Sequence, residues 1–206
     1  MSATIVLVCY ETQPLIRTAY ESIRRIYPDI KVIVVDGSRH RSACHYYTSV
    51  IRSKDTEVYQ VHYNIGHGEG MNFAMKHVQT KYAVLMDSDV TIQKECISAM
   101  IDIMDSSSVE LYGIGQIVKI ANNGINNASG FDYLHPHFAM ISKDMYRKYP
   151  PAAHHGAPMI LPMRQLRDRN EAYLLKSFPV SDYVLHKGRG TVSQVRRSQY
   201  TKGWVK

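Results

Sequence analysis

Strand-like and helix-like patterns alternate through the first hundred residues, and this alternation constrains the fold more than any other feature of the chain. Apolar runs rich in β-branched residues are each followed by a segment whose apolar residues recur at helical spacing. Such alternation predicts a Rossmann-like α/β fold, with a mostly parallel sheet, helices on both faces and ligands at the carboxyl ends of the strands. The predicted strands are 4–10, 31–35, 58–63 and 82–86, and the predicted helices begin near residues 14, 45, 70 and 97.

The length of the chain fits one domain. With 206 residues, of which 45% are apolar, the chain can bury a substantial core, and no linker-like segment divides it, so we expect a single domain over residues 1–206. Cys9, Cys44 and Cys96 are too scattered to indicate a disulfide framework or a Cys-based zinc site. The beginning lacks the features of a signal peptide, and no apolar run approaches the roughly 20 residues of a membrane span. We therefore expect a cytoplasmic protein.

Two carboxylates follow the fourth predicted strand. Asp87 and Asp89 flank Ser88 directly after the apolar run 82–86. A buried strand that ends in two acids places hard oxygen ligands at one point beyond the sheet edge, as a divalent cation carrying a phosphate requires. Asp-x-Asp pairs also cap surface turns, but polar residues follow the other predicted strands too. These strand-end residues are Tyr10, Asp36 and Asn64.

Four segments together resemble the family 2 glycosyltransferases of the type-A fold. They are Ile5 to Thr12, Val32 to Ser38, Asn64 to Ala74 and Asp87 to Asp89, so the resemblance covers residues 3–92 well and the remainder loosely. It implies transfer of a sugar from a nucleoside-diphosphate sugar, a UDP-sugar first of all, to a hydroxyl acceptor, with Mn²⁺ or Mg²⁺ at the two-Asp motif. It also implies a donor half over about 1–92, an acceptor half over about 93–186 and a basic loop or tail over 187–206.

The resemblance carries roles over to individual positions. Asp89, with help from Asp87 and Ser88, would bind the ribose and the metal ion, which makes Asp89 the predicted catalytic residue. A cation that bridges two phosphates stabilises the charge that develops as the diphosphate leaves. The family often has two acids before Gly-Ser, whereas Val35 takes the first place here, and this leaves the base open. Tyr10, Glu11 and Asp36 would contact the base, and the segment with Asn64, Gly66 and Asn72 would border the diphosphate.

A late histidine is the third predicted metal ligand. The run 178–186 reads as a strand that ends in His186, and many type-A glycosyltransferases complete the metal site with a histidine just before a flexible loop. Imidazole together with carboxylate suits Mn²⁺. A lone histidine at a strand end can also be structural. With His186 on the metal, Lys187 and Arg189 would lie beside the diphosphate, where cations stabilise the leaving group.

The acceptor half gives no clear general base. A strand over 130–142 and a short helix over 143–149 are predicted, but the Glu-Asp pair that the family places on the next helix is missing. His154 and His155 occupy about that place, and His155 could deprotonate a hydroxyl near neutral pH, although a surface pair or a phosphate ligand fits equally well. Five acids remain open as the base: Asp132, Asp144, Asp168, Glu171 and Asp182.

Two other functions and one other motif remain as alternatives to the glycosyltransferase interpretation. Asp87 to Thr91 also matches the signature of haloacid-dehalogenase-type phosphatases, with Asp87 as nucleophile and Asp89 as acid/base, but there the motif lies on the first strand. A non-catalytic module that binds a nucleotide or a polyanion would explain the missing Glu-Asp pair. The glycines at 66, 68 and 70 imitate a dinucleotide fingerprint, although Met71 stands where its third glycine would fall; a simple turn before a helix is the plainer reading.

The charge of the chain bears on the acceptor. The net charge is +7, and residues 187–206 contain six basic residues and no acid, with Tyr200 and Trp204 among them. Such a segment could bind a polyanion, which could be nucleic acid, an anionic glycan or a phospholipid surface, and DNA with hydroxylated, phage-type bases is the first specific acceptor to consider. It could also be a solvated tail, or an active-site loop whose cations serve the donor. No known nucleic-acid-binding signature is present.

Overall fold

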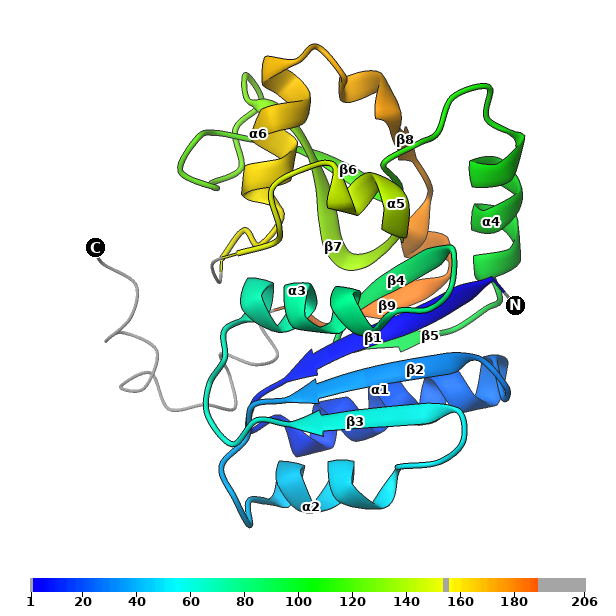
Figure 1. The fold of residues 1–206 in the computed structure, drawn as a ribbon, viewed down its shortest axis with the longest axis vertical. Helices are drawn as coiled ribbons and strands as arrows, with labels where there is room; N and C mark the ends of the chain where they lie inside the picture. The colour runs from blue at the N-terminus through cyan, green and yellow to red at the C-terminus, as the bar shows by residue number, and fades with distance from the viewer. Residues whose placement is uncertain (1, 154–155, 189–206) are drawn as a thin grey trace.

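The centre of the molecule is a seven-stranded sheet with the order β3-β2-β1-β4-β7-β6-β8 (Figure 1). The structure is a computed structural model that describes residues 2–153 and 156–188. Within this part of the chain, β7 is the strand that runs against the others, so the predicted mostly parallel α/β sheet is confirmed. The strands are β1 Ala3–Cys9, β2 Lys31–Asp36, β3 Thr56–Gln60, β4 Tyr82–Asp87, β6 Gly113–Ile120, β7 Phe131–Ser142 and β8 Leu175–Ser177.

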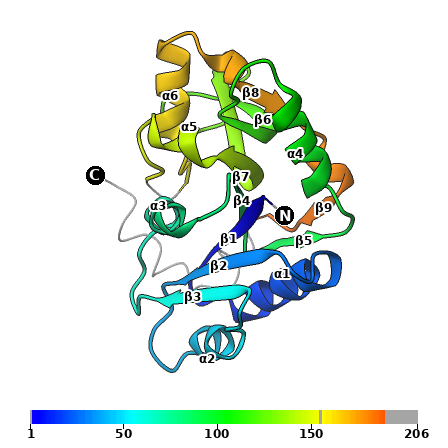
Figure 2. The same cartoon turned by 45° about the vertical axis from the view of Figure 1, so that its right-hand side comes forward.

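Helices cover both faces of the sheet, as predicted. One hydrophobic cluster joins α1, α2 and α4 to one face, and a second joins α3, α5 and α6 to the other. Figure 2 shows α1 and α2 on the opposite side of β2 and β3 from α3. The bounds are α1 Gln13–Ile26, α2 Ala43–Val50, α3 His67–His77, α4 Ile97–Ser106, α5 Lys143–Arg147 and α6 Ile160–Asp168, with 3₁₀ turns η1 Ala172–Leu174 and η2 Val180–Asp182.

The central strands form because their residues suit burial on both faces. β1 and β4 are apolar at nearly every position, and each lies between two neighbouring strands: β1 between parallel β2 and β4, and β4 between parallel β1 and antiparallel β7. Continuous apolar runs of this kind are typical of interior strands of an α/β sheet. In α1, Pro14 occupies the first turn, where its missing amide hydrogen costs nothing. Ile16, Ala19 and Ile23 then form the fully buried stripe that packs on the sheet.

Some boundaries differ from those predicted. β3 ends at Gln60, so Asn64 lies four residues beyond the strand, and α3 begins at His67 because the glycine-rich segment forms its first turn. The single strand predicted over 178–186 is wrong: η2 interrupts it, and only β9, Val184–His186, is extended. β9 pairs with the short β5, Val90–Ile92, in a separate two-stranded sheet. Neither β5 nor β6 nor β8 was predicted.

Two of the three cysteines lie side by side. The Sγ atoms of Cys9 and Cys44 are 3.7 Å apart, both residues are buried, and all three cysteines are free thiols. Hydrogen bonding with Cys44 and burial raise the pKa of the Cys9 thiol, so Cys9 packs as a neutral group where the end of β1 meets α2.

Among the described residues, no helix combines the length and the apolar character that crossing a bilayer would require.

Candidate active site

The ends of three parallel strands bring the predicted acids to one edge of the sheet. In the register of the sheet Cys9 pairs with Asp36 on one side of β1, while Val8 pairs with Asp87 on the other. The arrowheads of β1, β2 and β3 accordingly point to the same side in Figure 1. Because β4 ends level with β1, Asp87 projects where ligands bind in open α/β sheets.

Asp87, Asp89 and His186 form a cluster at this edge. One ligand atom from each residue lies within 4.8 Å of the other two, and His186 Nε2 is 3.3 Å from Asp89 Oδ1. Two carboxylates and one imidazole are a donor set that Mn²⁺ accepts, so these residues fit a divalent cation. The three predicted metal ligands therefore do come together.

The small β5–β9 sheet brings His186 to the two acids. Asp89 leads directly into β5, and Val90 pairs with His186 across the antiparallel ladder. The Lys187 amide donates to the Asp89 carbonyl oxygen at 3.2 Å, which extends the pairing by one residue. A residue almost one hundred positions later in the chain is thus fixed beside the two-Asp motif by backbone hydrogen bonds.

Three further histidines surround the cluster, and the sequence reasoning missed them as site residues. His67 Nε2, in the first turn of α3, is 3.0 Å from Asp87 Oδ1. The Nδ1 atoms of His135 and His137 on β7 are 2.8 Å apart, and the His137 ring stacks on His186 with 4.7 Å between centroids. The sequence signal was the i, i+2 spacing of His135 and His137, which places both on one side of a strand.

Two of these histidines, His135 and His137, lie in an irregular stretch of β7. The register of the β6–β7 pairing shifts between Gly115 and Ile117, because Gly115 pairs with Ala139 whereas Ile117 pairs with Leu134. β7 therefore contains extra residues at this point. Pro136 lies in this stretch, and a residue without an amide hydrogen is tolerated where the ladder is already broken. His135 and His137 flank it beyond Phe138, the last residue that pairs with β4.

The charges of the cluster are coupled. Burial opposes ionisation of Asp87, but the hydrogen bond and charge of His67, together with the charges of His135 and His186, outweigh it and lower the pKa of Asp87 to about 2. The hydrogen bond to Asp89 raises the pKa of His186. Burial, together with His135 and His186, lowers the pKa of His137 to about 4, so His137 is neutral near pH 7.

Next to this cluster, the loops after β1 and β2 are tied together. The Arg39 amide donates to Glu11 Oε1 at 2.8 Å, and the Arg39 guanidinium lies 3.2 Å from the same oxygen. The Glu11 amide donates to Ser38 Oγ at 2.8 Å, and Glu11 itself adopts a left-handed φ of 54°. Tyr10, which is half-buried, precedes this junction.

Asp36 lies at the same edge but turns inward. It is completely buried, its Oδ1 accepts the Ser38 amide hydrogen at 2.8 Å, and its Oδ2 accepts the Thr48 hydroxyl at 2.6 Å. In this arrangement Asp36 fixes the loop after β2 against α2. The direct contact with a base that its position implied stays a prediction, whereas its support of the loop is visible.

The segment at the start of α3 combines exposed and packed positions. Asn64 is exposed, and its side chain accepts the Gly66 amide hydrogen at 3.2 Å. Gly66 precedes the helix with φ 87°, a conformation that favours glycine. Asn72, farther along α3, accepts a long 3.4 Å hydrogen bond from the Tyr146 hydroxyl and so faces α5.

The remaining predicted residues divide into placed and unplaced ones. Ser88 is buried between the two acids, and the Thr12 hydroxyl donates to it at 3.5 Å. Lys187 is exposed next to the metal cluster. His155 and Arg189, and nearly all of the basic segment, lie outside the described residues.

The five open base candidates do not join the cluster at the sheet edge. Asp132 forms an ion pair with Lys119 at 2.9 Å, and Glu171 accepts the Tyr149 hydroxyl at 2.7 Å. These contacts give both acids a structural partner.

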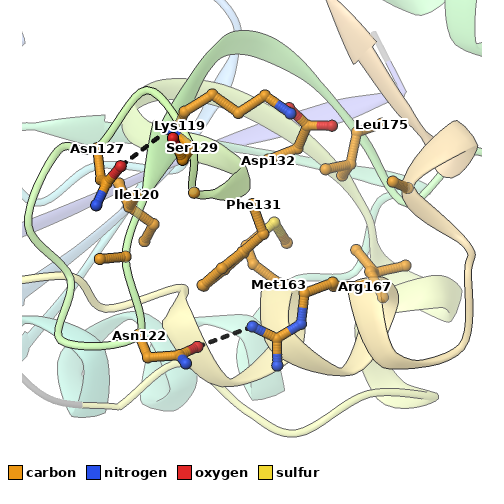
Figure 3. A pocket seen from close by; sticks show the side chains of 14 residues that line it. Lys119, Ile120, Asn122, Asn127, Ser129, Phe131, Asp132, Met163, Arg167 and Leu175 are labelled. Atoms are coloured by element: carbon orange, nitrogen blue, oxygen red, sulfur yellow. Dashed lines mark hydrogen bonds and ion pairs between the residues drawn. The ribbon is translucent and has the colours of Figure 1, made fainter.

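A cavity of about 500 Å³ lies between β6, β7 and α6. Figure 3 shows Phe131 at its centre, with the Lys119–Asp132 pair on one side and Met163 and Arg167 on the other. The Arg167 guanidinium lies 4.8 Å from the centre of the Phe131 ring. Phe131 and His135 are four residues apart on the same strand, roughly 13 Å at 3.3 Å per residue. The cavity is therefore a neighbour of the metal cluster, built entirely from the second half of the chain.

Comparison with protein families identifies residues 4–160 as matching the family described as "Glycosyl transferase family 2". Among curated proteins, the chain is 31% identical over 94 residues to mouse (Mus musculus) beta-1,4 N-acetylgalactosaminyltransferase 2. That match covers 45% of this chain and 17% of the relative, so the chain spans less than a fifth of its length.

Solved structures share the fold at low sequence identity. S. aureus TarS (residues 1–349) in complex with UDP-GlcNAc superposes with a TM-score of 0.64 at 15% identity, covering 94% of this chain and 61% of that one. Glucosyl-3-phosphoglycerate synthase from Mycobacterium tuberculosis, in complex with Mn²⁺, UDP and phosphoglyceric acid, gives 0.58 at 14% identity over 85% of this chain and 67% of that one. The fold is that of the type-A glycosyltransferases.

Proposed function

Because this chain belongs to glycosyl transferase family 2, we propose that it transfers a sugar from a nucleoside-diphosphate sugar to an acceptor hydroxyl. The observation that carries the proposal is the convergence of Asp87, Asp89 and His186 at the carboxyl edge of the sheet, next to the loops that Glu11 joins. Membership of the family argues against the dehalogenase-type phosphatase. The two-Asp motif also begins at the last residue of β4, the fourth strand of the chain, whereas in those phosphatases it lies on the first strand.

The metal ion of this reaction would be Mn²⁺ or Mg²⁺, held by Asp87, Asp89 and His186. Bound there, it would neutralise the charge that develops on the diphosphate as the sugar departs. His67 would keep Asp87 ionised and oriented, because the two side chains already form an ion pair at 3.0 Å. Lys187 and Arg189 would add positive charge beside the diphosphate.

UDP is the nucleotide best supported. The two solved relatives contain UDP-GlcNAc or UDP, and the curated relative is named as an N-acetylgalactosaminyltransferase. The base would contact Tyr10 and Glu11, next to the loop after β2 that Asp36 holds in place. Asn64, Gly66 and Asn72 would border the diphosphate from the start of α3.

The acceptor would enter from the second half of the chain. The cavity beside Phe131 offers an aromatic ring, amides and charged groups, which is a lining suited to a saccharide or another polyhydroxylated compound. Hydroxylated DNA is the alternative acceptor that the basic C-terminal segment favours. His155 remains the proposed general base. Replacing Arg167 by alanine should lower transfer to an acceptor while leaving hydrolysis of the donor unchanged, and equal losses of both would place the acceptor elsewhere.

A thermal-shift titration tests the donor site. UDP with Mn²⁺ at about 100 times Kd should stabilise the protein by about 2.7 kcal/mol, which raises Tm by roughly 5–10 °C for a domain of this size. Asp89→Ala should abolish the shift, whereas Asp102→Ala, which removes an exposed carboxylate of α4, should keep it. If UDP and GDP both leave Tm unchanged in the presence of Mn²⁺, the donor proposal is wrong.

Hydrolysis separates an enzyme from a non-catalytic module. UDP-glucose, UDP-GlcNAc and UDP-GalNAc are incubated with the protein and Mn²⁺, and the release of UDP is measured. A catalytic site should release UDP from at least one of them, and Asp89→Ala should stop it. Binding of UDP without release from any sugar, and without transfer to any acceptor, would favour the non-catalytic module.

A further inference from the structure

A second cluster of histidines lies at the ends of β2 and β3 and shares no residue with the cluster at Asp87. It consists of His40 in the loop after β2, His45 in the first turn of α2 and His62 after β3. One ring nitrogen of each lies within 4.8 Å of the other two, and the ring centroids are 5.0 to 5.7 Å apart. We propose that these three histidines bind a late transition-metal ion, with Zn²⁺ as the best fit.

The backbone of His45 is held from two directions. Its amide donates to the capping Ser42 side chain at 3.2 Å, and its carbonyl oxygen accepts Gln60 Nε2 of β3 at 2.8 Å. Its Nδ1 is buried and has no hydrogen-bond partner among the described residues. A buried polar atom without a partner is unfavourable and calls for an explanation, and a bound ion is one of the usual ones.

The other two ligands come from turns that bend sharply toward His45. His62 has φ 61°, in the left-handed region that a non-glycine residue seldom adopts, and so has Arg41, next to His40, with φ 64°. Such conformations persist where the surrounding structure requires them and cluster at ligand sites. The chain thus turns at both places in a way that brings the imidazoles together.

The ligand set decides which ion the site would take. Three imidazoles favour Zn²⁺, Cu²⁺, Ni²⁺ or Co²⁺, whereas Mg²⁺ and Ca²⁺ prefer carboxylate and carbonyl oxygens. Zinc–nitrogen bonds of about 2.0–2.1 Å at tetrahedral angles place the nitrogens roughly 3.3 Å apart. Because the three nitrogens lie within 4.8 Å of one another, they would need to approach by at most about 1.5 Å. His40 and His62 are exposed and can rotate to do so. The fourth position would be open to water.

A metal ion here would act on the architecture of the nucleotide pocket. It would tie the loop after β2 to α2 and to the chain that leaves β3. Arg39, next to His40, bonds Glu11 in the loop after β1. The ion would therefore brace one wall of the expected base pocket, as a structural site separate from the carboxylate-rich site at Asp87.

Zinc stoichiometry tests this proposal directly. In tag-free, full-length protein carrying Asp87→Ala, Asp89→Ala and His186→Ala, which disables the other site, Zn²⁺ binding is measured by calorimetry before and after adding His40→Ala and His62→Ala. We expect the two histidine substitutions to remove one bound ion per chain. His77→Ala, which removes a histidine whose ring packs at a tilt against Phe73 and Tyr59, is the matched control and should remove none.

The location is checked in the otherwise unaltered chain. In long-range ¹H–¹⁵N spectra, Zn²⁺ should shift the imidazole signals of His40, His45 and His62 together. Unchanged stoichiometry in the His40→Ala, His62→Ala protein, or unmoved signals of these three rings, would overturn the proposal. Since both substituted side chains are exposed, circular dichroism should show that the fold persists. Neither result bears on the donor site, because no ligand is shared.

Discussion

Gly68 lies inside α3, where the helix touches the backbone of another segment. A Cβ atom built on Gly68 would be 2.4 to 2.6 Å from backbone atoms of Ala153, and backbone cannot move aside as a side chain can. Gly70, two residues farther along α3, faces the Val8 side chain of β1 instead, with the nearest atom at 2.6 Å. The glycine-rich segment is therefore built for close packing, and the dinucleotide fingerprint that it imitates is not needed to explain it.

This contact predicts an unusual substitution effect. Glycine to alanine inside a helix normally gains up to about 1 kcal/mol from helix propensity, but overpacking costs about 1–3 kcal/mol. Gly68→Ala should therefore destabilise the protein, and Gly70→Ala should cost less because a Val8 methyl group can rotate. Urea unfolding of both variants measures the difference. Equal stability of Gly68→Ala and the unaltered protein would show that Ala153 does not lie where the structure places it.

At the scale of elements, the β5–β9 ladder connects the end of the chain to the metal cluster. The Gln93 amide donates to the Tyr183 carbonyl oxygen at 2.8 Å, and the Lys187 amide donates to that of Asp89 at 3.2 Å. These bonds flank the pairs Ile92–Val184 and Val90–His186. In the alternation of an antiparallel ladder, Thr91 and Leu185 between them form the hydrogen-bonded pair.

Breaking that pair should loosen His186 without touching a ligand. Leu185→Pro removes an amide hydrogen in the centre of the ladder, and Leu185, being exposed, contributes little to the core. We expect Mn²⁺ affinity to fall by about 10- to 100-fold, the usual effect of losing support for a metal ligand. Titration followed by electron paramagnetic resonance gives the affinity. Leu185→Ser keeps the amide and should bind Mn²⁺ normally; weakening in both variants would point to the side chain.

The elements that could be predicted from the sequence are those with an unambiguous local pattern. β1, β2 and β4 are apolar runs of the length of a strand, and the acids that end β2 and β4 stand out against them. β6 contains Gly113 and Gly115, which weaken a strand signal, yet both are required because Met140 and Phe138 carbonyl oxygens of β7 lie within 2.7 to 3.1 Å of a Cβ there.

The site was predictable only where one strand end carried the signal. Asp87 and Asp89 are recognisable because two acids directly follow an apolar run. The role of His186 followed from the family resemblance, although the strand assigned to it was wrong. His67, His135 and His137 reach the site through the packing of α3 and the break in β7, which are tertiary features. The same holds for His40, His45 and His62, of which the first and the last are 22 residues apart in sequence and meet only when β2 and β3 pair.

At the scale of the whole molecule, the uneven charge predicts how the protein meets a polyanion. The net charge is +7, and Arg196→Ser, Arg197→Ser and Lys202→Ser together would reduce it to +4. If DNA binds through this segment, the slope of log K against log salt should become shallower by roughly three, at about 0.9 per phosphate contact. Gel-shift titrations over a series of salt concentrations supply the slope.

The matched control carries the same net charge. Lys54→Ser, Lys94→Ser and Lys176→Ser remove three exposed cations from elsewhere on the described surface and also give +4. Equal weakening in both triple variants would mean that net charge alone attracts DNA, and the acceptor proposal for DNA would lose its support. The Tm shift with UDP and Mn²⁺ should be the same in both, because the metal ligands are retained.

The reversed strand β7 divides the described sheet into two parts, which come from different halves of the sequence. On one side are β1 to β4, which follow one another in sequence and carry the acids and loops of the donor edge. On the other side are β6 and β8, which come later in the sequence; β6 pairs with β7, and β8 pairs with β6. Within the part of the chain that the structure describes, only the β4–β7 pairing joins the two parts of the sheet. A junction with so little pairing is a natural point for recombination. Replacing the part that contains β6, β7, β8 and the cavity could change the acceptor, while the strands that carry the donor site stay the same.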